Sequence, residues 1–218
     1  MQRYTIQVGS FEVNCSLLEN EGKALIIDPG QEADRIIAAL ENKGWEPEAI
    51  LLTHGHFDHI NGIPGLLERF PDLPVYVSEE DAKVMSHPMN SLPPEYSPVT
   101  VPSKNLKTDL RNSSFSILHS SFTVVPTPGH TPGGVCYFFP DFTTTQPSPD
   151  ARPVPVLFSG DTLFAGSVGR TDLPGGDMAT LMRSLDSLRT LPEDTVVIPG
   201  HGMTTTIGRE LASNPFLQ

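Results

Sequence analysis

The chain carries three histidines and an aspartate within six consecutive positions. In the segment THGHFDH, His54 and His56 are two residues apart, as on an extended strand end, so both imidazoles can face one point. Asp58 and His59 follow where the chain turns toward a helix-like segment. Imidazole and carboxylate groups without a thiolate suit Zn²⁺, with iron or manganese as substitutes. This segment is therefore expected to supply ligands to two adjacent divalent metal ions.

Three further segments share one local pattern, in which an apolar, strand-like run breaks at small or turn-forming residues before a ligand-type side chain. FTVVPTPGH ends at His130, VPVLFSGD at Asp161 and TVVIPGH at His201. Buried strands that end at the same sheet edge place such residues in a shared crevice. Three ligands for each ion and one bridging carboxylate account for the set: His54, His56 and His130 on one ion, Asp58, His59 and His201 on the other, and Asp161 between them.

Other residues of similar type are expected to have different roles. Asp28, in ALIIDPG, also follows an apolar run, and we expect its carboxylate to orient the histidine loop rather than to bind metal. His87 precedes a proline at a junction between a helix and a loop, and His119 lies in a hairpin turn, so both are assigned surface or structural roles. Cys15 and Cys136 lie in strand-like stretches and are expected to be buried apolar residues.

The elements that must position these residues are mixed, with strands predominating. Apolar runs predict strands at 3–8, 13–19, 24–28, 49–53, 74–77, 115–118, 122–126, 134–139, 154–158 and 195–198. Helical spacing predicts helices in EADRIIAALENKG, ended by Gly44, and in DMATLMRSLDSLRTLP, with shorter ones at 62–69, 79–86 and 206–213. Two proline-rich segments are predicted loops: HPMNSLPPEYSPVTVPSKN, long enough to form part of a pocket rim, and DFTTTQPSPDARPVP, a mobile turn between two strands.

Length and charge narrow the choice of partners. The chain has 218 residues, which suits one domain over 1–218. Its net charge of -12 disfavours a nucleic-acid partner, because that binding relies on clustered Lys and Arg. The sequence has no run of about 18 apolar residues that could span a bilayer, and its N-terminus lacks a secretory pattern. We expect a cytoplasmic protein with neither a nucleic-acid nor a membrane partner.

In this order, THGHFDH, PGHT, FSGDT and PGH resemble the metal-binding motifs of the metallo-β-lactamase superfamily, from about residue 10 to residue 205. The resemblance implies an α+β fold, a four-layer αββα sandwich with two mixed β-sheets and the metals at one edge between them. It also gives the same seven ligands. Asp161 stands where some β-lactamases of the superfamily have cysteine, and His56 where flavodiiron oxygen reductases have glutamate, which disfavours those two branches.

Within the superfamily, GDTLFAGSVGRTDLPGGD and TTTIGRELASNPFL resemble the short glyoxalase II-like (hydroxyacylglutathione hydrolase-like) hydrolases. Full-length glyoxalase II has an additional C-terminal helical domain that helps to bind glutathione, and we expect this chain to lack it. The resemblance implies a small-molecule thioester substrate, an S-acylglutathione such as S-lactoylglutathione. Arg170 and Asp172 are interpreted as an ion pair that fixes a loop near the site, and Tyr96 is a further candidate for substrate contact.

The predicted reaction is the attack of a bridging hydroxide, oriented by Asp58, on a thioester carbonyl. Metal coordination lowers the pKa of water toward about 7, and a thiol with a pKa of about 8.5 leaves without a dedicated acid. Three alternatives stay open. A mononuclear-iron persulfide dioxygenase would use His54, His130 and Asp161 as a triad. A lactonase would use the same metal site, and a non-catalytic metal-binding protein would be expected to have lost ligands.

Overall fold

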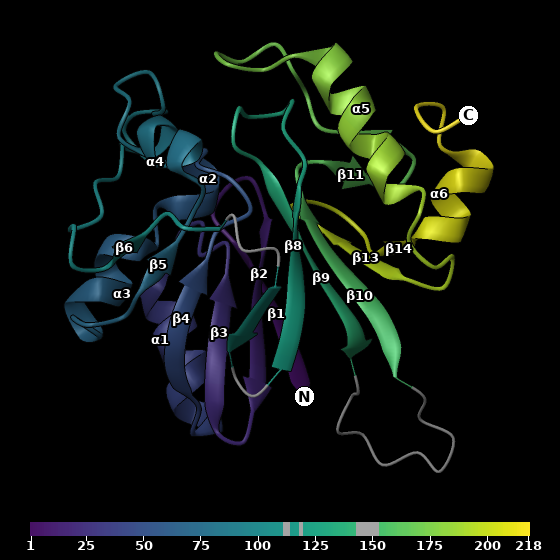
Figure 1. The fold of residues 1–218 in the computed structure, drawn as a ribbon. Helices are drawn as coiled ribbons and strands as arrows, with labels where there is room; N and C mark the ends of the chain where they lie inside the picture. Colours follow the sequence, from purple (N-terminus) through teal and green to yellow (C-terminus); the bar gives the residue numbers. More distant parts are fainter. Residues whose placement is uncertain (111–113, 118–119, 143–152) are drawn as a thin grey trace.

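The computed structural model describes residues 1–110, 114–117, 120–142 and 153–218. Within these residues the strands form two six-stranded sheets and a small two-stranded ribbon. The two large sheets face each other, and helices cover both outer faces (Figure 1). This arrangement is the four-layer αββα sandwich with mixed sheets that the family resemblance implies.

The first sheet has the order β1-β2-β3-β4-β5-β6. It pairs antiparallel from β1 to β3 and parallel from β3 to β6. Its strands are β1 Gln2–Val8, β2 Val13–Asn20, β3 Lys23–Ile27, β4 Glu46–Leu51, β5 Val75–Tyr76 and β6 Leu106–Lys107. The helices associated with it are α1 Ala33–Lys43, α2 Phe57–Ile60, α3 Ile63–Arg69 and α4 Glu79–Met85. As predicted, α1 ends at Gly44, whose φ of 68° closes the helix with a left-handed residue.

The second sheet has the order β14-β13-β10-β9-β8-β7. Only the β10–β13 pair within it is parallel among the described strands. Its strands are β7 Ser114–Ile117, β8 Ser120–Pro126, β9 Val135–Phe142, β10 Val154–Gly160, β13 Val196–Pro199 and β14 Thr205–Thr206. The ribbon consists of β11 Leu163–Phe164 and β12 Ser167–Val168, and the outer helices are α5 Met178–Leu188 and α6 Ile207–Ser213.

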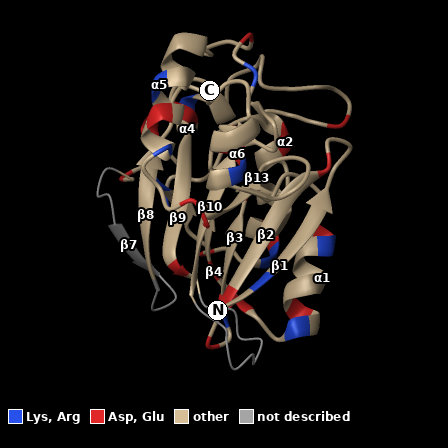
Figure 2. Cartoon of the chain, turned by 90° about the vertical axis from the view of Figure 1, so that its right-hand side faces the viewer, with Lys and Arg blue, Asp and Glu red and all other residues tan. Residues whose placement is uncertain are grey.

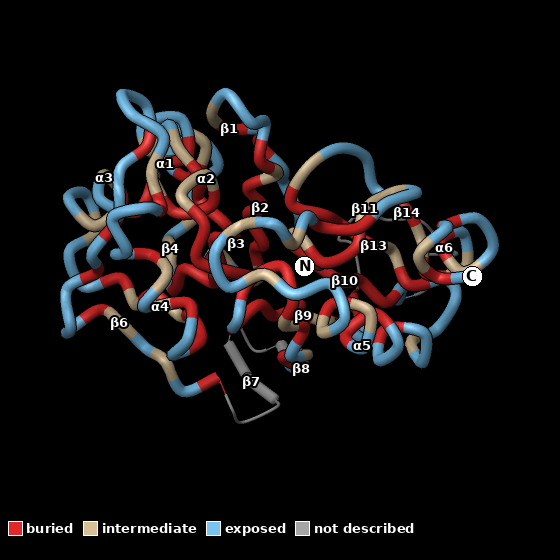
Figure 3. The backbone as a smooth tube through the Cα atoms, turned by 90° about the horizontal axis from the view of Figure 1, so that it is seen from above, coloured by how far each residue is buried: buried red, intermediate tan, exposed pale blue. Residues whose placement is uncertain are grey.

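Alternation along the strands divides the apolar residues among three cores. In β3, Leu25 and Ile27 face the second sheet, whereas Ala24 and Ile26 pack toward α1 and α3. The third core lies between the second sheet and helices α5 and α6. Figure 3 shows the strands as the buried centre of the molecule and the connecting loops as its exposed margin. Successive side chains of a strand point to opposite faces, so a sheet that is covered on both faces contributes residues to two cores.

The two predicted structural cysteines occupy the outer cores. Cys15 is buried in the core under α1, and Cys136 is buried in the core under α5, and both are free thiols. Burial raises the pKa of the Cys136 thiol to about 11, so this residue is a poor nucleophile at neutral pH.

Short elements account for the differences between the predicted and observed structure. Helix α2 and the two-residue strands β6, β11, β12 and β14 are absent from the sequence-based prediction, because so few residues show no period. His119 and residues 143–152 of the second proline-rich segment lie outside the described part of the chain.

Most charged side chains outside the site lie on the outer helices, on the loops and at exposed strand positions. Along α1 both signs of charge occur (Figure 2), and Lys43 lies over the rings of Tyr4 and Trp45. In the described residues no helix is long and apolar enough to cross a membrane.

One edge of the sandwich collects the carboxyl ends of five strands. β3 and β4 run parallel in the first sheet, and β8, β10 and β13 share a direction in the second. The residues that follow these strands are therefore brought together where the two sheets meet, which is the usual position of a site in an open α/β sheet.

Candidate metal centre

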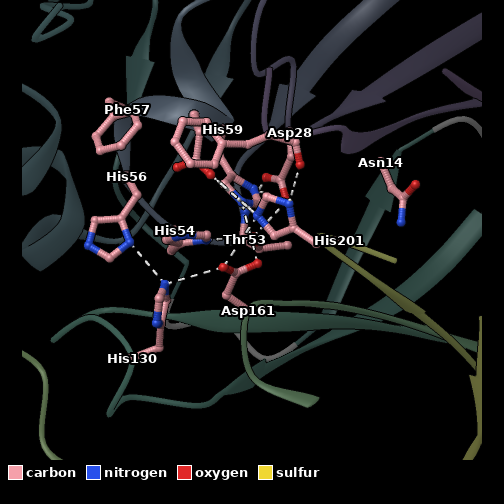
Figure 4. A network of polar contacts seen from close by, with 12 residues as sticks. Asn14, Asp28, Thr53, His54, His56, Phe57, His59, His130, Asp161 and His201 are labelled. Carbon is pink, nitrogen blue, oxygen red and sulfur yellow. Dashed lines mark hydrogen bonds and ion pairs between the residues drawn. The ribbon is translucent and has the colours of Figure 1, made fainter. Parts of the chain in front are cut away.

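The structure gathers all seven predicted ligands at this edge, and Figure 4 labels all of them except Asp58. Two compact sets of ligand atoms, each with mutual distances within 4.8 Å, match the predicted division between two ions: His54, His56 and His130 in the first set, and Asp58, His59 and His201 in the second. A third such set joins His54, His59 and Asp161, and so connects the other two.

Asp161 lies between the two sets. Its Oδ1 is 3.4 Å from Nε2 of His59, and its Oδ2 is 3.5 Å from Nε2 of both His130 and His201. Oδ2 therefore lies near a nitrogen from each of the two sets, as the sequence-based hypothesis of a bridging carboxylate requires.

Local folding fixes the loops that carry these side chains. The chain leaves β4 at Leu51 and reaches His56 in an extended conformation, after which α2 presents Asp58 and His59 from its first turn. Gly55 lies so close to α4 that a Cβ there would be 2.5 Å from the carbonyl oxygen of Asp81. The glycine in THGHFDH is thus required by close packing.

Hydrogen bonds outside the cluster decide which nitrogen of each ring faces inward. Nδ1 of His130 lies 2.7 Å from the carbonyl oxygen of Arg170, and Nδ1 of His201 lies 2.8 Å from that of Phe11. A carbonyl oxygen only accepts, so both Nδ1 atoms carry the proton. In the neutral ring, Nε2 then carries a free lone pair that is directed into the cluster.

Asp28 and Thr53 set the orientation of His54 in the same way. The Thr53 hydroxyl donates to Oδ2 of Asp28 at 2.6 Å, and it lies 3.1 Å from Nδ1 of His54. Because the hydroxyl has a single hydrogen, which it gives to Asp28, it accepts a hydrogen bond from Nδ1–H of His54, and Nε2 of His54 is left unprotonated. Oδ2 of Asp28 also lies 3.1 Å from Nδ1 of His59. Asp28 thus contacts the outer side of the cluster, as expected from the sequence.

Several close approaches fit a site built for cations. Nδ1 of His56 is 2.9 Å from Nε2 of His130, and Nε2 of His59 is 3.3 Å from Nε2 of His201. Two imidazole nitrogens this close need a shared proton or a cation between them. In addition, Nε2 of His54 and Oδ1 of Asp161 are buried without a hydrogen-bond partner in the described residues. Buried polar atoms normally have a partner, and a bound divalent ion would supply one here.

The pKa values follow from burial and from the charges within the cluster. Burial, reinforced by the neighbouring histidines, lowers the pKa of His54 well below its usual value, and burial next to His130 lowers that of His56 to about 4. For His59, burial acts in the same direction, but the charges of Asp161 and Asp58 raise its pKa well above the usual value. His54 and His56 therefore offer neutral imidazoles at neutral pH, the form that binds metals.

Asp81 is a structural residue of the site that the sequence reasoning missed. Its Oδ2 accepts hydrogen bonds from Gly55 N at 2.9 Å and the Thr131 hydroxyl at 2.6 Å, and its Oδ1 accepts one from Gly133 N at 2.7 Å. Burial raises the pKa of this carboxyl, and the three hydrogen bonds partly offset that increase. Asp81 thus ties the loop of His54 and His56 to the loop of His130.

The first proline-rich segment supports the same loop from the other side. Asn90 accepts a hydrogen bond from Phe57 N at 3.0 Å and donates one to the carbonyl oxygen of Gly55 at 2.8 Å. A sequence signal for these supporting residues is weak: Asp81 sits three residues after Ser78, where it is typical of a helix start, and Asn90 sits among prolines, where it is typical of a turn.

The side chains of the remaining predicted residues lie outside the ligand cluster. Arg170 and Asp172 form an exposed two-pronged ion pair, with distances of 2.7 and 2.8 Å, and Arg170 reaches the cluster only through its carbonyl oxygen. Tyr96 is buried, and its hydroxyl accepts a hydrogen bond from Ser10 N, so its position does not suit substrate contact. His87 is exposed and lies outside the three ligand sets of the described residues.

Comparison with known proteins agrees with this geometry. Residues 8–142 and 148–201 match the family described as the Metallo-beta-lactamase superfamily, so the chain belongs to that superfamily. Its fold and His/Asp cluster are those of a metal-binding hydrolase.

Among individual proteins, the chain is similar to a hydroxyacylglutathione hydrolase, GloC, of Haemophilus influenzae, with 37% identity over 97% of this chain and 96% of that protein. The crystal structure of BLEG-1 B3 metallo-beta-lactamase has a TM-score of 0.86 and 37% identity, with 99% of both chains covered. That of TTHA1623 in a di-iron-bound form has a TM-score of 0.80 and 35% identity, with 98% of this chain and 100% of that chain covered.

Proposed function

We propose that this chain is a dinuclear metal-dependent hydrolase of small-molecule thioesters, with S-acylglutathiones such as S-lactoylglutathione as its substrates. The observation that carries the proposal is the pair of three-residue ligand sets with Asp161 between them. The similarity to the hydroxyacylglutathione hydrolase of Haemophilus influenzae supports the choice of substrate. Zinc is the proposed metal because the ligands are imidazoles and carboxylates, although TTHA1623 has been solved with two irons.

Two bound divalent ions would supply a water of lowered pKa and stabilise negative charge on the acyl oxygen. In hydrolysis, the water oxygen bonds to the acyl carbon, the C–S bond breaks, and the thiolate leaves with the electron pair. Oδ2 of Asp58 lies 3.3 Å from Nε2 of His201, within the cluster, where it would orient the attacking water and hold its proton. The hydrogen bonds of His54, His130 and His201 keep their rings fixed during the reaction.

The nature of the leaving group favours a thioester over an amide. A thiol with a pKa of about 8.5 leaves as a thiolate near neutral pH, whereas an amine needs a proton donor. The titratable side chains in the adjoining pocket are Glu80, Lys83 and His87, in addition to the predicted ligand His56. All three are exposed, away from the ligand sets of the described residues.

A mononuclear-iron persulfide dioxygenase is the competing reaction, with His54, His130 and Asp161 as its triad. The geometry favours the dinuclear reading, because Asp58, His59 and His201 form a second set that a single ion would leave unused. The two readings differ in a simple observable, since the dioxygenase consumes oxygen and the hydrolase does not.

The test is hydrolysis of S-lactoylglutathione by zinc-loaded protein without oxygen, followed by the loss of thioester absorbance. We expect turnover that a chelator abolishes. Asp161→Ala should lose both activity and bound metal, whereas the control Asp172→Ala, which breaks only the exposed ion pair, should keep its metal content. Absence of turnover in protein that holds two ions would refute the thioesterase, and oxygen uptake with a persulfide would establish the competitor.

A further inference from the structure

A pocket of about 460 Å³ opens beside the cluster on the side of His56. That volume is within the range of small-molecule sites. Its walls are supplied by α4, by the first proline-rich segment, and by the loops that follow His130 and Arg170. The apolar side chains that line it are Phe57, Val84, Met89, Pro132, Leu173 and Pro174. In Figure 4, His56 and Phe57 lie together at the margin of the cluster, where this pocket begins.

The polar residues of the pocket are engaged elsewhere or lie in solvent. Asn90 is buried, and its amide group is used by the backbone of Gly55 and Phe57. The Lys83 side chain is 74% exposed, and its Nζ lies 3.5 Å from Oε1 of Glu79. Nδ1 of His87 accepts a hydrogen bond from Met89 N. The surface that the pocket offers to a ligand is therefore mainly apolar.

Exposed apolar side chains also gather on the segments around the cluster. Of the seven large exposed hydrophobic residues in the described chain, five belong to these segments: Phe11, Met89, Leu92, Met178 and Met203. The carbonyl oxygen of Phe11 holds His201, and Met203 follows His201 by two residues. Met178 follows Asp177, whose N–H donates to the carbonyl oxygen of Gly129, next to His130. Exposed apolar residues grouped around a site are typical of a surface that binds an apolar partner.

We propose that this pocket binds an apolar acyl group, so that the preferred substrates are thioesters with acyl chains longer and less polar than lactoyl. This inference rests on the proposed function, because it decides which part of the thioester, acyl or glutathione, enters the pocket. Glutathione carries two carboxylates and an ammonium, which are costly to bury in an apolar pocket without partners. The acyl side is the part of the substrate that the pocket walls fit.

The first experiment compares kcat/KM for S-acetyl-, S-butyryl- and S-hexanoylglutathione. If the acyl chain enters the pocket, kcat/KM should rise by up to about fourfold for each CH₂ group that is buried, the equivalent of about 0.8 kcal/mol. Val84→Asn, which places an amide in the pocket wall, should reduce the ratio of hexanoyl to acetyl turnover at least about tenfold, since several CH₂ groups lose apolar contact. The matched control is Val154→Asn, because Val154 is an exposed residue at the start of β10 outside the pocket lining.

Leu173→Asn is a second variant of the pocket wall, on a loop rather than on a helix, in case Val84→Asn folds poorly. It should reduce the same ratio. Equal kcat/KM across the three acyl chains in the unaltered protein would overturn the inference while leaving the thioesterase intact.

The second experiment measures binding without catalysis. S-methyl- and S-hexylglutathione are thioethers that cannot be hydrolysed, and calorimetry should show that the hexyl compound binds at least about tenfold more tightly, with a more negative heat-capacity change. Val84→Asn should remove that difference. If no thioester is hydrolysed but this difference is present, the proposed function fails and the apolar pocket stands. If thioesters are hydrolysed and the two thioethers bind equally, the pocket assignment fails and the function stands.

Discussion

Oδ2 of Asp28 lies 3.1 Å from Nδ1 of His59, on the side of the ring that faces away from the other ligands. Asp28 itself has a φ of 50°, a left-handed conformation that is uncommon for a residue with a side chain. Its carboxylate is held by Thr53, which donates both its N–H, at 2.8 Å, and its hydroxyl. A strained backbone position that is fixed this firmly is typical of a functional site.

Replacing Asp28 with Asn should therefore weaken metal binding, mainly at the Asp58, His59 and His201 set. The carboxylate of Asp28 fixes the ring of His59 and makes the imidazole more basic, and the substitution removes this negative charge. Loss of such an outer partner typically costs about 10–100-fold in metal affinity. Competition with a coloured chelator would measure the affinity of each ion. Asp34→Asn, on the exposed face of α1, is the control and should leave both affinities unchanged.

Asp81→Ala should lower the free energy of unfolding by about 2–4 kcal/mol, because it leaves three donors in the protein interior without their charged acceptor. Urea denaturation of the metal-free protein would measure the loss. Glu79→Ala, two residues earlier on the same helix, removes a solvent-exposed carboxylate that contacts Lys83 and should change stability by less than about 1 kcal/mol. Equal effects of the two substitutions would show that Asp81 does not tie the two ligand loops together.

The gathering of the predicted ligands could be foreseen from the sequence because the segments that carry them follow strands whose apolar runs are visible. Asp161 and His201, for example, come directly after the runs of β10 and β13, and parallel strands necessarily end at the same edge. The outer position expected for Asp28 rests instead on the rule that metal-bound imidazoles normally have outer hydrogen-bond partners. Those predictions needed only local patterns and the topology that follows from them.

The supporting residues depend on packing between elements that are distant in the sequence. Asp81 reaches Gly133 across 52 positions, and His201 is held by the carbonyl oxygen of Phe11 across 190 positions. Backbone groups such as this oxygen, or that of Arg170, have no signature in the sequence. The apolar pocket likewise arises only when α4 and the loop around Leu173 come together. Tyr96 was a wrong candidate for substrate contact because a tyrosine in a loop gives no sign of whether it is buried.

Lowering the pH should remove the two ions one after the other, and the ion held by Asp58, His59 and His201 should leave first. A raised pKa means that a proton binds more tightly and competes with the metal at higher pH. The pKa values of His59 and His201 are raised, whereas those of His54 and His56 are lowered, that of His56 to about 4. As the pH falls through the usual histidine range, and before it reaches about 4, metal content should therefore fall from two ions toward one. Dialysis at a series of pH values followed by metal analysis would show this, and simultaneous loss of both ions would contradict it.

Gly200, the residue before His201, provides a steric test of the cluster. A Cβ at this position would lie 2.2 Å from Oδ1 of Asp161 and 2.6 Å from Cε1 of His59. The backbone cannot move away freely, because Gly200 N donates to the carbonyl oxygen of Gly160 at 2.8 Å and its own carbonyl oxygen accepts from Asn14 N at 2.7 Å. The added methyl group must therefore displace the Asp161 carboxylate, the His59 ring, or both.

Gly200→Ala should fold but bind fewer than two ions, since the displaced side chains join the two ligand sets. Gly202→Ala is the matched control, because a Cβ there meets nothing within 4 Å. Its φ of 75° is unfavourable for alanine, so that variant should lose about 1–2 kcal/mol of stability and still bind both ions. Metal analysis together with urea denaturation separates the two effects. If Gly200→Ala retained two ions with unchanged affinity, then Asp161 and His59 could not both be ligands in the positions that the structure gives them.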